Sequence, residues 1–209
     1  MDKLLKNRAF IFLGLGQAAS GLGGTFATFI MSWLVYELTG SFVAMGSIWV
    51  ATMVPSMITQ LWSGPYLDRW NRKKVMIFSE WLRAAAFLIP ALTFAIGELQ
   101  IWHLYITAVI IGVAEPLFRP SSMAFVAELL PKDHLNKGNA ILEGTMQVML
   151  LIGPPSGGLI LQWIGPQAVL LLLVGTMGGA GVLLLFLPNK KAGVSGSEET
   201  WFKQFKAGI

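Results

Sequence analysis

Long apolar segments alternate with short polar links along this chain. A helix needs about 20 mostly apolar residues to cross the roughly 30 Å of hydrocarbon in a bilayer. Six segments reach that length: residues 10–36, 43–66, 75–97, 101–126, 140–163 and 168–187. The pattern therefore predicts an all-α membrane protein with six transmembrane helices. The first apolar run is too long for the core of a signal peptide, so we expect it to remain as a helix.

Cationic residues concentrate in alternate links. The links near residues 40, 99 and 166 carry no lysine or arginine, whereas the N-terminus, the other two links and the tail are basic. Cations in short loops mark the cytoplasmic side. We therefore expect a multi-pass protein of the cell (inner) membrane with both termini cytoplasmic. Of the 15 lysines and arginines, only Arg83 and Arg119 fall inside predicted helices.

Composition supports a membrane protein and restricts the other classes. Hydrophobic residues make up 55% of the 209 and charged residues 12%, against about a quarter charged in soluble domains. The net charge of +4 follows from the basic links, so we expect lipid partners rather than nucleic acid. Cysteine is absent, which decides nothing about the compartment. Phosphate-binding loops and His/Cys metal clusters are also missing, so we expect neither an enzyme, an ATP-driven pump, a cofactor nor a metal site.

Two similar stretches suggest an internal repeat. Ser63-Gly64-x-x-Leu67-x-x-Trp70 ends the second predicted helix, and Ser156-Gly157-x-x-Ile160-x-x-Trp163 ends the fifth. Equivalent helices of opposite orientation indicate a three-plus-three inverted repeat. The expected domains are a six-helix bundle over residues 1–187 and a cytoplasmic segment over 188–209. The second contains the start of an amphipathic helix near Trp201.

Several motifs resemble those of one transporter family. Gly64-x-x-x-Asp68-Arg69-x-x-Arg72-Lys73 resembles the signature loop of the major facilitator superfamily, and Gly153-Pro154-x-x-Gly157-Gly158 is similar to its antiporter motif. Residues 36–41 and 128–140 resemble the branch that contains macrolide efflux proteins and the enterobactin exporter. The likeness runs from about residue 10 to the end of the chain. Asn71 replaces a motif glycine, and Ala108 stands where many antiporters carry an arginine.

The resemblance implies the N-terminal half of a twelve-helix fold. Its implied function is secondary active efflux of amphipathic small molecules, such as drugs, macrolides or siderophores, driven by protons through alternating access. The missing C-terminal six-helix half would come from the same gene, a partner chain or a second copy. Two alternatives are a transport-incompetent fragment and a six-helix membrane scaffold or lipid-handling protein.

The charged link after the second helix is predicted to act as a gate. Asp68 can accept hydrogen bonds from nearby cations, and the cations can bridge to Glu128 or Glu80. A network that closes in only one conformation biases a two-state equilibrium. Topogenic charge with lipid headgroup contact is the alternative. The expected gating residues are Gly64, Asp68, Arg69, Arg72, Lys73 and Glu128.

Glu115 and Arg119 are the candidates for proton coupling or substrate contact. Glu115 lies about 21 Å along its helix at 1.5 Å per residue, within the membrane core. Charges there are costly. The two residues are four apart, so they can pair, and each precedes a proline, which predicts a broken helix on a hydrated cavity wall. Glu115 would exchange a proton and Arg119 would be its alternating partner or an anion contact; a purely structural pair is the alternative.

The remaining candidates are structural. Glu80 and Arg83 are expected to pair near the inner end of the third helix and support the charged link. Gly153, Gly157 and Gly158 leave a side-chain-free stripe for close helix packing, and Pro154 is expected to bend the axis. Other polar and methionine side chains are candidates for a cavity lining: Gln17, Thr28, Trp33, Met53, Met57, Gln60, Gln147 and Met149.

Overall fold

All the regular elements that the structure describes are α-helices. The computed structural model describes residues 7–67 and 70–189. The elements within them are α2 (Arg8–Thr39), α3 (Phe42–Leu67), α4 (Arg72–Ala95), α5 (Ile101–Leu129) and α6 (Lys132–Leu185). Each is long and apolar enough to cross a membrane. The expected all-helical membrane fold is confirmed, whereas Asp68, Arg69 and residues 190–209 lie outside the described parts.

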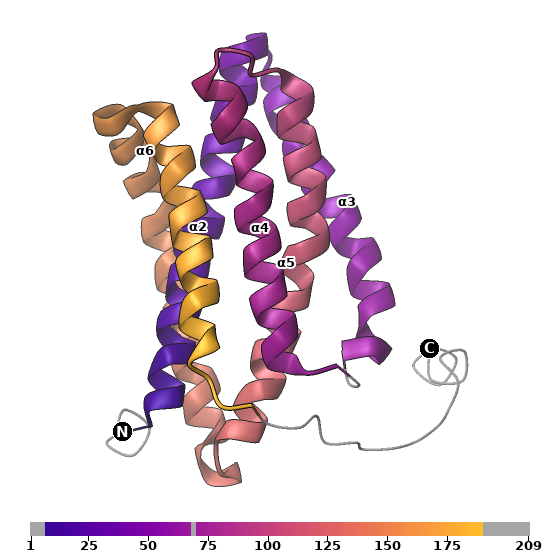
Figure 1. The fold of residues 1–209 in the computed structure, drawn as a ribbon, viewed down its shortest axis with the longest axis vertical. Coiled ribbons are helices and arrows are strands. Elements are labelled where there is room, and N and C mark those ends of the chain that lie inside the picture. The colour runs from indigo at the N-terminus through magenta and orange to yellow at the C-terminus, as the bar shows by residue number, and fades with distance from the viewer. Residues whose placement is uncertain (1–6, 68–69, 190–209) are drawn as a thin grey trace.

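The element α6 is interrupted inside its 54 residues. Gly165 has φ 75° and ψ 168°, which is not a helical conformation. The chain turns back there, and the second segment of α6 then descends beside the rest of the bundle (Figure 1). The two segments contain the apolar stretches 140–163 and 168–187. The count of six membrane spans and the inverted repeat stay predictions, since the described residues form five helical elements.

The three links without lysine or arginine share a backbone feature. Gly40, Gly97 and Gly165 are the glycines with positive φ in the described residues, at 65°, 75° and 75°. Glycine adopts this region without steric cost. The α2–α3 and α4–α5 links lie at one end of the bundle, and the start of α2 and the end of α6 lie at the other (Figure 1). The basic links and the links without cations therefore alternate between the two ends, as the pattern of lysine and arginine predicts.

The helices pack in an uneven arrangement. α6 packs against α2 and α4, α4 also packs against α5, and α3 packs mainly against α5. Fully buried side chains such as Phe87, Leu104 and Leu173 join these helices in the core. By contrast, only 6% of the apolar window of α3 is buried within the chain. α3 is thus the edge helix, and it is the one that leaves most apolar surface uncovered.

Small residues allow the closest helix contacts. A methyl group on Gly112 of α5 would overlap the carbonyl oxygen of Thr52 in α3. On α6, a methyl group on Gly153 would overlap the side chain of Thr25 in α2. Gly157 faces the rings of Phe26 and Phe29 of α2, and Gly158 also faces Phe29. Helix association in membranes depends on such close packing, and α6 continues as a helix through Pro154.

The Gly112 contact predicts a measurable loss of stability. Gly112→Ala should destabilise the protein by about 1–3 kcal/mol, because backbone atoms of α3 would have to move. Thermal unfolding of the detergent-solubilised protein measures the change. Gly175→Ala is the matched control, since nothing lies within 4 Å of a methyl group there. Equal melting temperatures for the two variants would contradict the prediction.

Candidate functional site

An ion pair is buried in the centre of the bundle. Arg83 Nη1 donates to Glu80 Oε1 at 2.9 Å, and the two residues lie three apart on α4. Ser20 of α2 completes the cluster: its hydroxyl donates to Glu80 Oε1 at 2.7 Å and accepts from Arg83 Nη1 at 2.9 Å. Glu80 is 0% exposed and Arg83 2%. The predicted Glu80–Arg83 pair is therefore confirmed, with Ser20 as a partner that the sequence did not indicate.

The position of this cluster differs from the one expected. Arg83 lies eleven residues after the start of α4 at Arg72, which is about 16 Å of helix rise. That distance is about half the thickness of the hydrocarbon layer. The pair thus lies at mid-helix against α2, rather than near the charged link. No hydrogen bond among the described residues joins it to Arg72 or Lys73.

Part of this cluster has unused hydrogen-bonding capacity. Glu80 Oε2 and Arg83 Nε are buried, and neither has a partner among the described residues. Unpaired buried polar atoms are uncommon in folded proteins because each one costs free energy. On the other side of Glu80, a methyl group on Gly181 of α6 would meet Trp81 and the Cβ of Glu80. α6 therefore closes one side of the cluster.

A cavity of about 300 Å³ opens beside the cluster, between α2, α3, α4 and α5. Its charged lining residues are Arg83 from α4 and Glu115 from α5. Glu115 is exposed and makes no hydrogen bond or ion pair with another described residue. The remaining lining is apolar or carries hydroxyl groups: Gly24, Ala27, Thr28, Met31, Ile48, Trp49, Thr52, Met53, Ser56, Ala108 and Ile111. The sequence indicated Glu115, Thr28 and Met53 for a cavity, but not Arg83 or Trp49.

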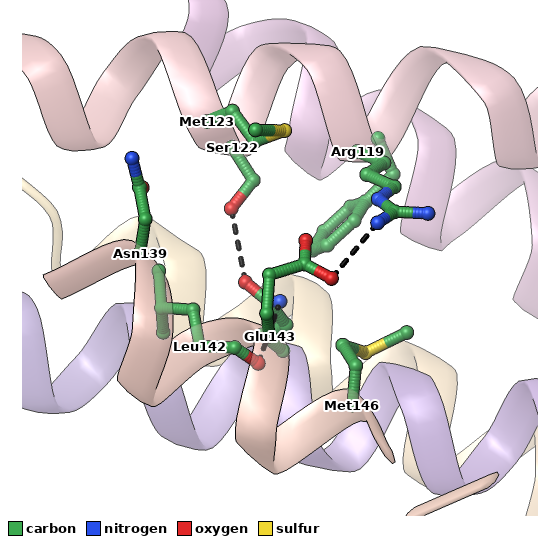
Figure 2. A pocket seen from close by; sticks show the side chains of 9 residues that line it. Arg119, Ser122, Met123, Asn139, Leu142, Glu143 and Met146 are labelled. Carbon is green, nitrogen blue, oxygen red and sulfur yellow. Dashed lines mark hydrogen bonds and ion pairs between the residues drawn. The ribbon is translucent and has the colours of Figure 1, made fainter. Parts of the chain in front are cut away.

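Arg119 binds a different partner from the one expected. Its Nη2 donates to Glu143 Oε2 of α6 at 2.8 Å (Figure 2). The Glu115–Arg119 pair is not formed, and α5 continues as a helix through Pro116 and Pro120. The expected pairing and the expected helix break are therefore wrong. The expected coupling roles of Glu115 and Arg119 remain predictions.

A small pocket surrounds the Arg119–Glu143 pair, between α5, α6 and Gln17 of α2. Ser122 donates to Gln17 Oε1 at 3.1 Å, and Gln17 Nε2 donates to the Leu142 carbonyl at 3.4 Å. Figure 2 shows Arg119 and Ser122 of α5 facing Leu142 and Glu143 of α6. Direct contact between α5 and α6 is otherwise sparse. Polar side chains thus connect two helices that pack little against each other.

Two cations at the start of α4, Arg72 and Lys73, bind the ends of neighbouring helices. Arg72 forms an ion pair with Glu128 of α5 and also donates to the Ala124 carbonyl at 3.3 Å. Lys73 donates to the Leu185 carbonyl at 2.8 Å and to the Leu187 carbonyl. The expected bridge from Arg72 to Glu128 is formed, whereas Lys73 instead binds the last carbonyls of α6. A cation is favourable there, because the final carbonyls of a helix lack intrahelical partners.

The residue that replaces the motif glycine has a structural role. Asn71 is the N-cap of α4, and its side chain accepts from the Lys74 backbone N–H at 3.1 Å. Asparagine is among the preferred N-cap residues. Gly64, the first motif residue, lies in the last turn of α3. Asp68 and Arg69 are outside the described residues, so their expected part in the gate stays a prediction.

The buried ion pair predicts a large effect when one partner is removed. Glu80→Ala leaves the Arg83 charge uncompensated and should cost about 3–5 kcal/mol of stability. Glu80→Leu combined with Arg83→Leu removes both charges and should cost much less. Thermal unfolding in detergent measures both variants, with exposed Glu98→Ala as the control. A Glu80→Ala protein as stable as the Glu98→Ala protein would contradict the role of the pair.

Comparison with known proteins places the chain in a family. The family model described as Major Facilitator Superfamily matches residues 13–208. YvqJ, an MFS-type transporter of Bacillus subtilis (strain 168), is 24% identical over 181 residues, covering 86% of this chain and 43% of YvqJ.

Two further relatives carry names that refer to multidrug resistance or efflux. Multidrug resistance protein 2 of the same organism is 27% identical over 157 residues, covering 75% of this chain and 36% of that protein. The multidrug efflux pump Tap of Mycolicibacterium fortuitum is 27% identical over 157 residues, covering 71% and 37%. The chain spans less than half the length of these three relatives. With its long apolar helices and a family match over most of its length, the chain belongs to the Major Facilitator Superfamily.

Proposed function

We propose that the chain is the N-terminal half of a secondary active exporter, with six transmembrane helices and both termini in the cytoplasm. The break at Gly165 supports two separate spans within α6, because the chain reverses there without any charged residue in the link. The alternation between the two ends of the bundle of basic links and links without lysine or arginine supports the orientation. The similarity of residues 63–70 and 156–163 supports an inverted repeat.

The cavity lined by Arg83 and Glu115 is the main observation that supports a transport function. Ionisable groups inside a membrane protein are costly and generally mark a substrate or ion pathway. The cavity combines these charges with an indole ring, methionines and hydroxyl groups, which suits an amphipathic small molecule. The printed names of two relatives refer to multidrug resistance or efflux, which supports export of drugs, macrolides or siderophores.

Glu115 is the proposed proton-coupling residue. It faces the cavity without a partner, so it is free to take up and release a proton as its access changes. A proton that enters across 100 mV releases about 2.3 kcal/mol, which can drive a transport cycle. Arg119 holds Glu143 in this structure, so its proposed part as an alternating partner of Glu115 requires that ion pair to break.

The inner ends of α4, α5 and α6 form the proposed gate. Arg72 joins α4 to α5, and Lys73 joins α4 to α6, so these three helices are tied together at one face. We infer that these bonds, with Asp68 and Arg69, rearrange between inward-open and outward-open states. A second six-helix half would complete the cavity, supplied by the same polypeptide, by a partner chain or by a second copy of this chain.

The proposed orientation predicts which positions are accessible from each side of the membrane. Because this sequence has no cysteine, each single-cysteine variant can be labelled only at the introduced position. Asn136→Cys, an exposed position in the polar start of α6, should react with a membrane-impermeant maleimide only in inverted vesicles. Glu98→Cys, at the α4–α5 link, should react only in intact spheroplasts. The opposite pattern would contradict the orientation.

Glu115→Gln should abolish proton-driven transport, because an amide cannot carry the proton. The assay uses inverted vesicles with an imposed pH gradient and a panel of a macrolide, a catecholate siderophore and a lipophilic dye. Two forms are tested: the chain expressed alone, and the protein expressed from the full open reading frame of its gene. We expect at least a tenfold fall in gradient-driven uptake, the size of a loss of about 1.4 kcal/mol, with Glu98→Gln as the matched control.

The outcomes of this assay separate the proposals. Full proton-driven uptake by the Glu115→Gln protein would remove Glu115 from coupling. Transport by the chain alone would favour a half-size transporter that works as a dimer. The absence of transport in both forms, for every compound of the panel, would contradict the proposed function and favour a membrane scaffold.

A further inference from the structure

Among the described residues, the guanidinium of Arg83 makes hydrogen bonds through one of its three nitrogens. Nη1 makes both contacts, to Ser20 Oγ and Glu80 Oε1. Nε is buried without a partner, and Nη2 makes no hydrogen bond to any described residue. A guanidinium presents five N–H donors in a fixed plane, and Nε and Nη2 share one edge of it. That free edge has the geometry that a carboxylate matches with two parallel hydrogen bonds.

Arg83 is part of the wall of the cavity. Arg83 and Gly24 both line it, and a methyl group on Gly24 would stand 3.0 Å from Nη2. At this position any residue other than glycine would put a side chain against the guanidinium. Gly24 therefore keeps the Nη2 side of the guanidinium free of a side chain. The anchor itself is rigid, since Glu80 and Ser20 hold the other side of the guanidinium.

The same cavity carries an opposite charge and an apolar surface. Glu115 of α5 offers a carboxylate that no described residue neutralises. Ile48, Trp49 and Met53 of α3 supply apolar and aromatic area. A ligand complementary to the whole cavity must accept hydrogen bonds from Arg83, carry a positive charge near Glu115 and present an apolar surface to α3.

We propose that the cavity binds an amphipathic zwitterion. Its carboxylate accepts hydrogen bonds from the free edge of Arg83, its protonated amine contacts Glu115, and its apolar part packs on Trp49. The proposal rests on the transport function above and specifies its substrate class. It also explains an exchange: the amine and a coupling proton compete for the carboxylate of Glu115, so occupation by one excludes the other.

Ligands with a single charge fit the cavity less well. A simple cation compensates Glu115 but leaves two N–H donors of Arg83 without an acceptor. A simple anion meets Arg83 but leaves the carboxylate of Glu115 without a cation. Buried unpaired donors and uncompensated charges both weaken binding in a medium of low polarity. The zwitterion avoids both penalties.

Three matched fluorescent probes test the proposed preference for a zwitterion over singly charged ligands. ε-Dansyl-lysine carries a free amine and a free carboxylate on one apolar label; its methyl ester lacks the carboxylate charge, and its α-N-acetyl derivative lacks the amine charge. Dansyl emission reports binding to the detergent-solubilised full chain. We expect the zwitterion to bind about tenfold more tightly than either derivative, because each derivative loses one charge-assisted contact. Equal affinities for the three probes would overturn the proposal.

Two substitutions assign the contacts. Arg83→Lys keeps the positive charge but loses the planar donor edge, so the preference for the zwitterion over the ester should fall to about one. Glu115→Gln should instead remove the preference over the acetyl derivative. Arg8→Lys and Glu98→Gln, both at exposed positions outside the cavity, should keep both preferences. Because each preference is a ratio within one protein, a partial loss of folded material does not change it.

A third variant covers the case in which the Arg83→Lys protein does not fold. Gly24→Ala leaves the ion pair intact and places a methyl group beside Nη2, so it should weaken the zwitterion and leave the ester almost unchanged. If neither Arg83→Lys nor Gly24→Ala lowers the zwitterion-to-ester preference, Arg83 is not the anchor and the proposal fails.

The binding assay is independent of the transport assay. It needs neither a gradient nor a second half. A zwitterion preference without any transport would support this site and count against the proposed exporter. Transport of the panel by a protein without the preference would overturn the site and leave the exporter in place.

Discussion

Two charges buried at the middle of a membrane helix are the constraint on which this structure depends. Glu80 and Arg83 are nearly inaccessible to solvent, and neither could stay charged there alone without a severe desolvation penalty. They lie three apart on α4, so they meet each other, and Ser20 brings α2 to the same point. Gly181 lets α6 close over the far side. Three helices are therefore positioned by a single polar cluster.

The sequence predicted the helices well because the bilayer imposes a simple requirement. Each span needs an apolar length, and basic links fall on one side, so residues 10–126 could be divided almost correctly by inspection. The boundary of α6 was harder. Its helix starts eight residues before the apolar run, since residues 132–139 are mostly polar yet helical. The interruption at Gly165, by contrast, falls in the link that the apolar pattern predicts near residue 166.

The candidate site was only partly predictable, because pairing across helices depends on rotation and register. The local i, i+3 pair of Glu80 and Arg83 could be read from spacing alone. The same reasoning failed for Glu115 and Arg119, where the i, i+4 spacing allowed a pair but α6 supplied Glu143 instead. Nothing in the spacing of Ser20 or Gly24 indicates that both face Arg83. Contacts within one helix follow from the spacing of residues in the sequence, whereas contacts between helices depend on how the helices pack.

The bond between Lys73 and the end of α6 has a mechanical consequence. Its ammonium joins points 112 residues apart in the chain, one at the entrance of α4 and one where the polypeptide leaves the bundle. A tilt of α4 must then pull on that exit point or rupture the bond. Movement of α4, the helix that carries Arg83, is therefore transmitted through Lys73 to the chain at Leu187.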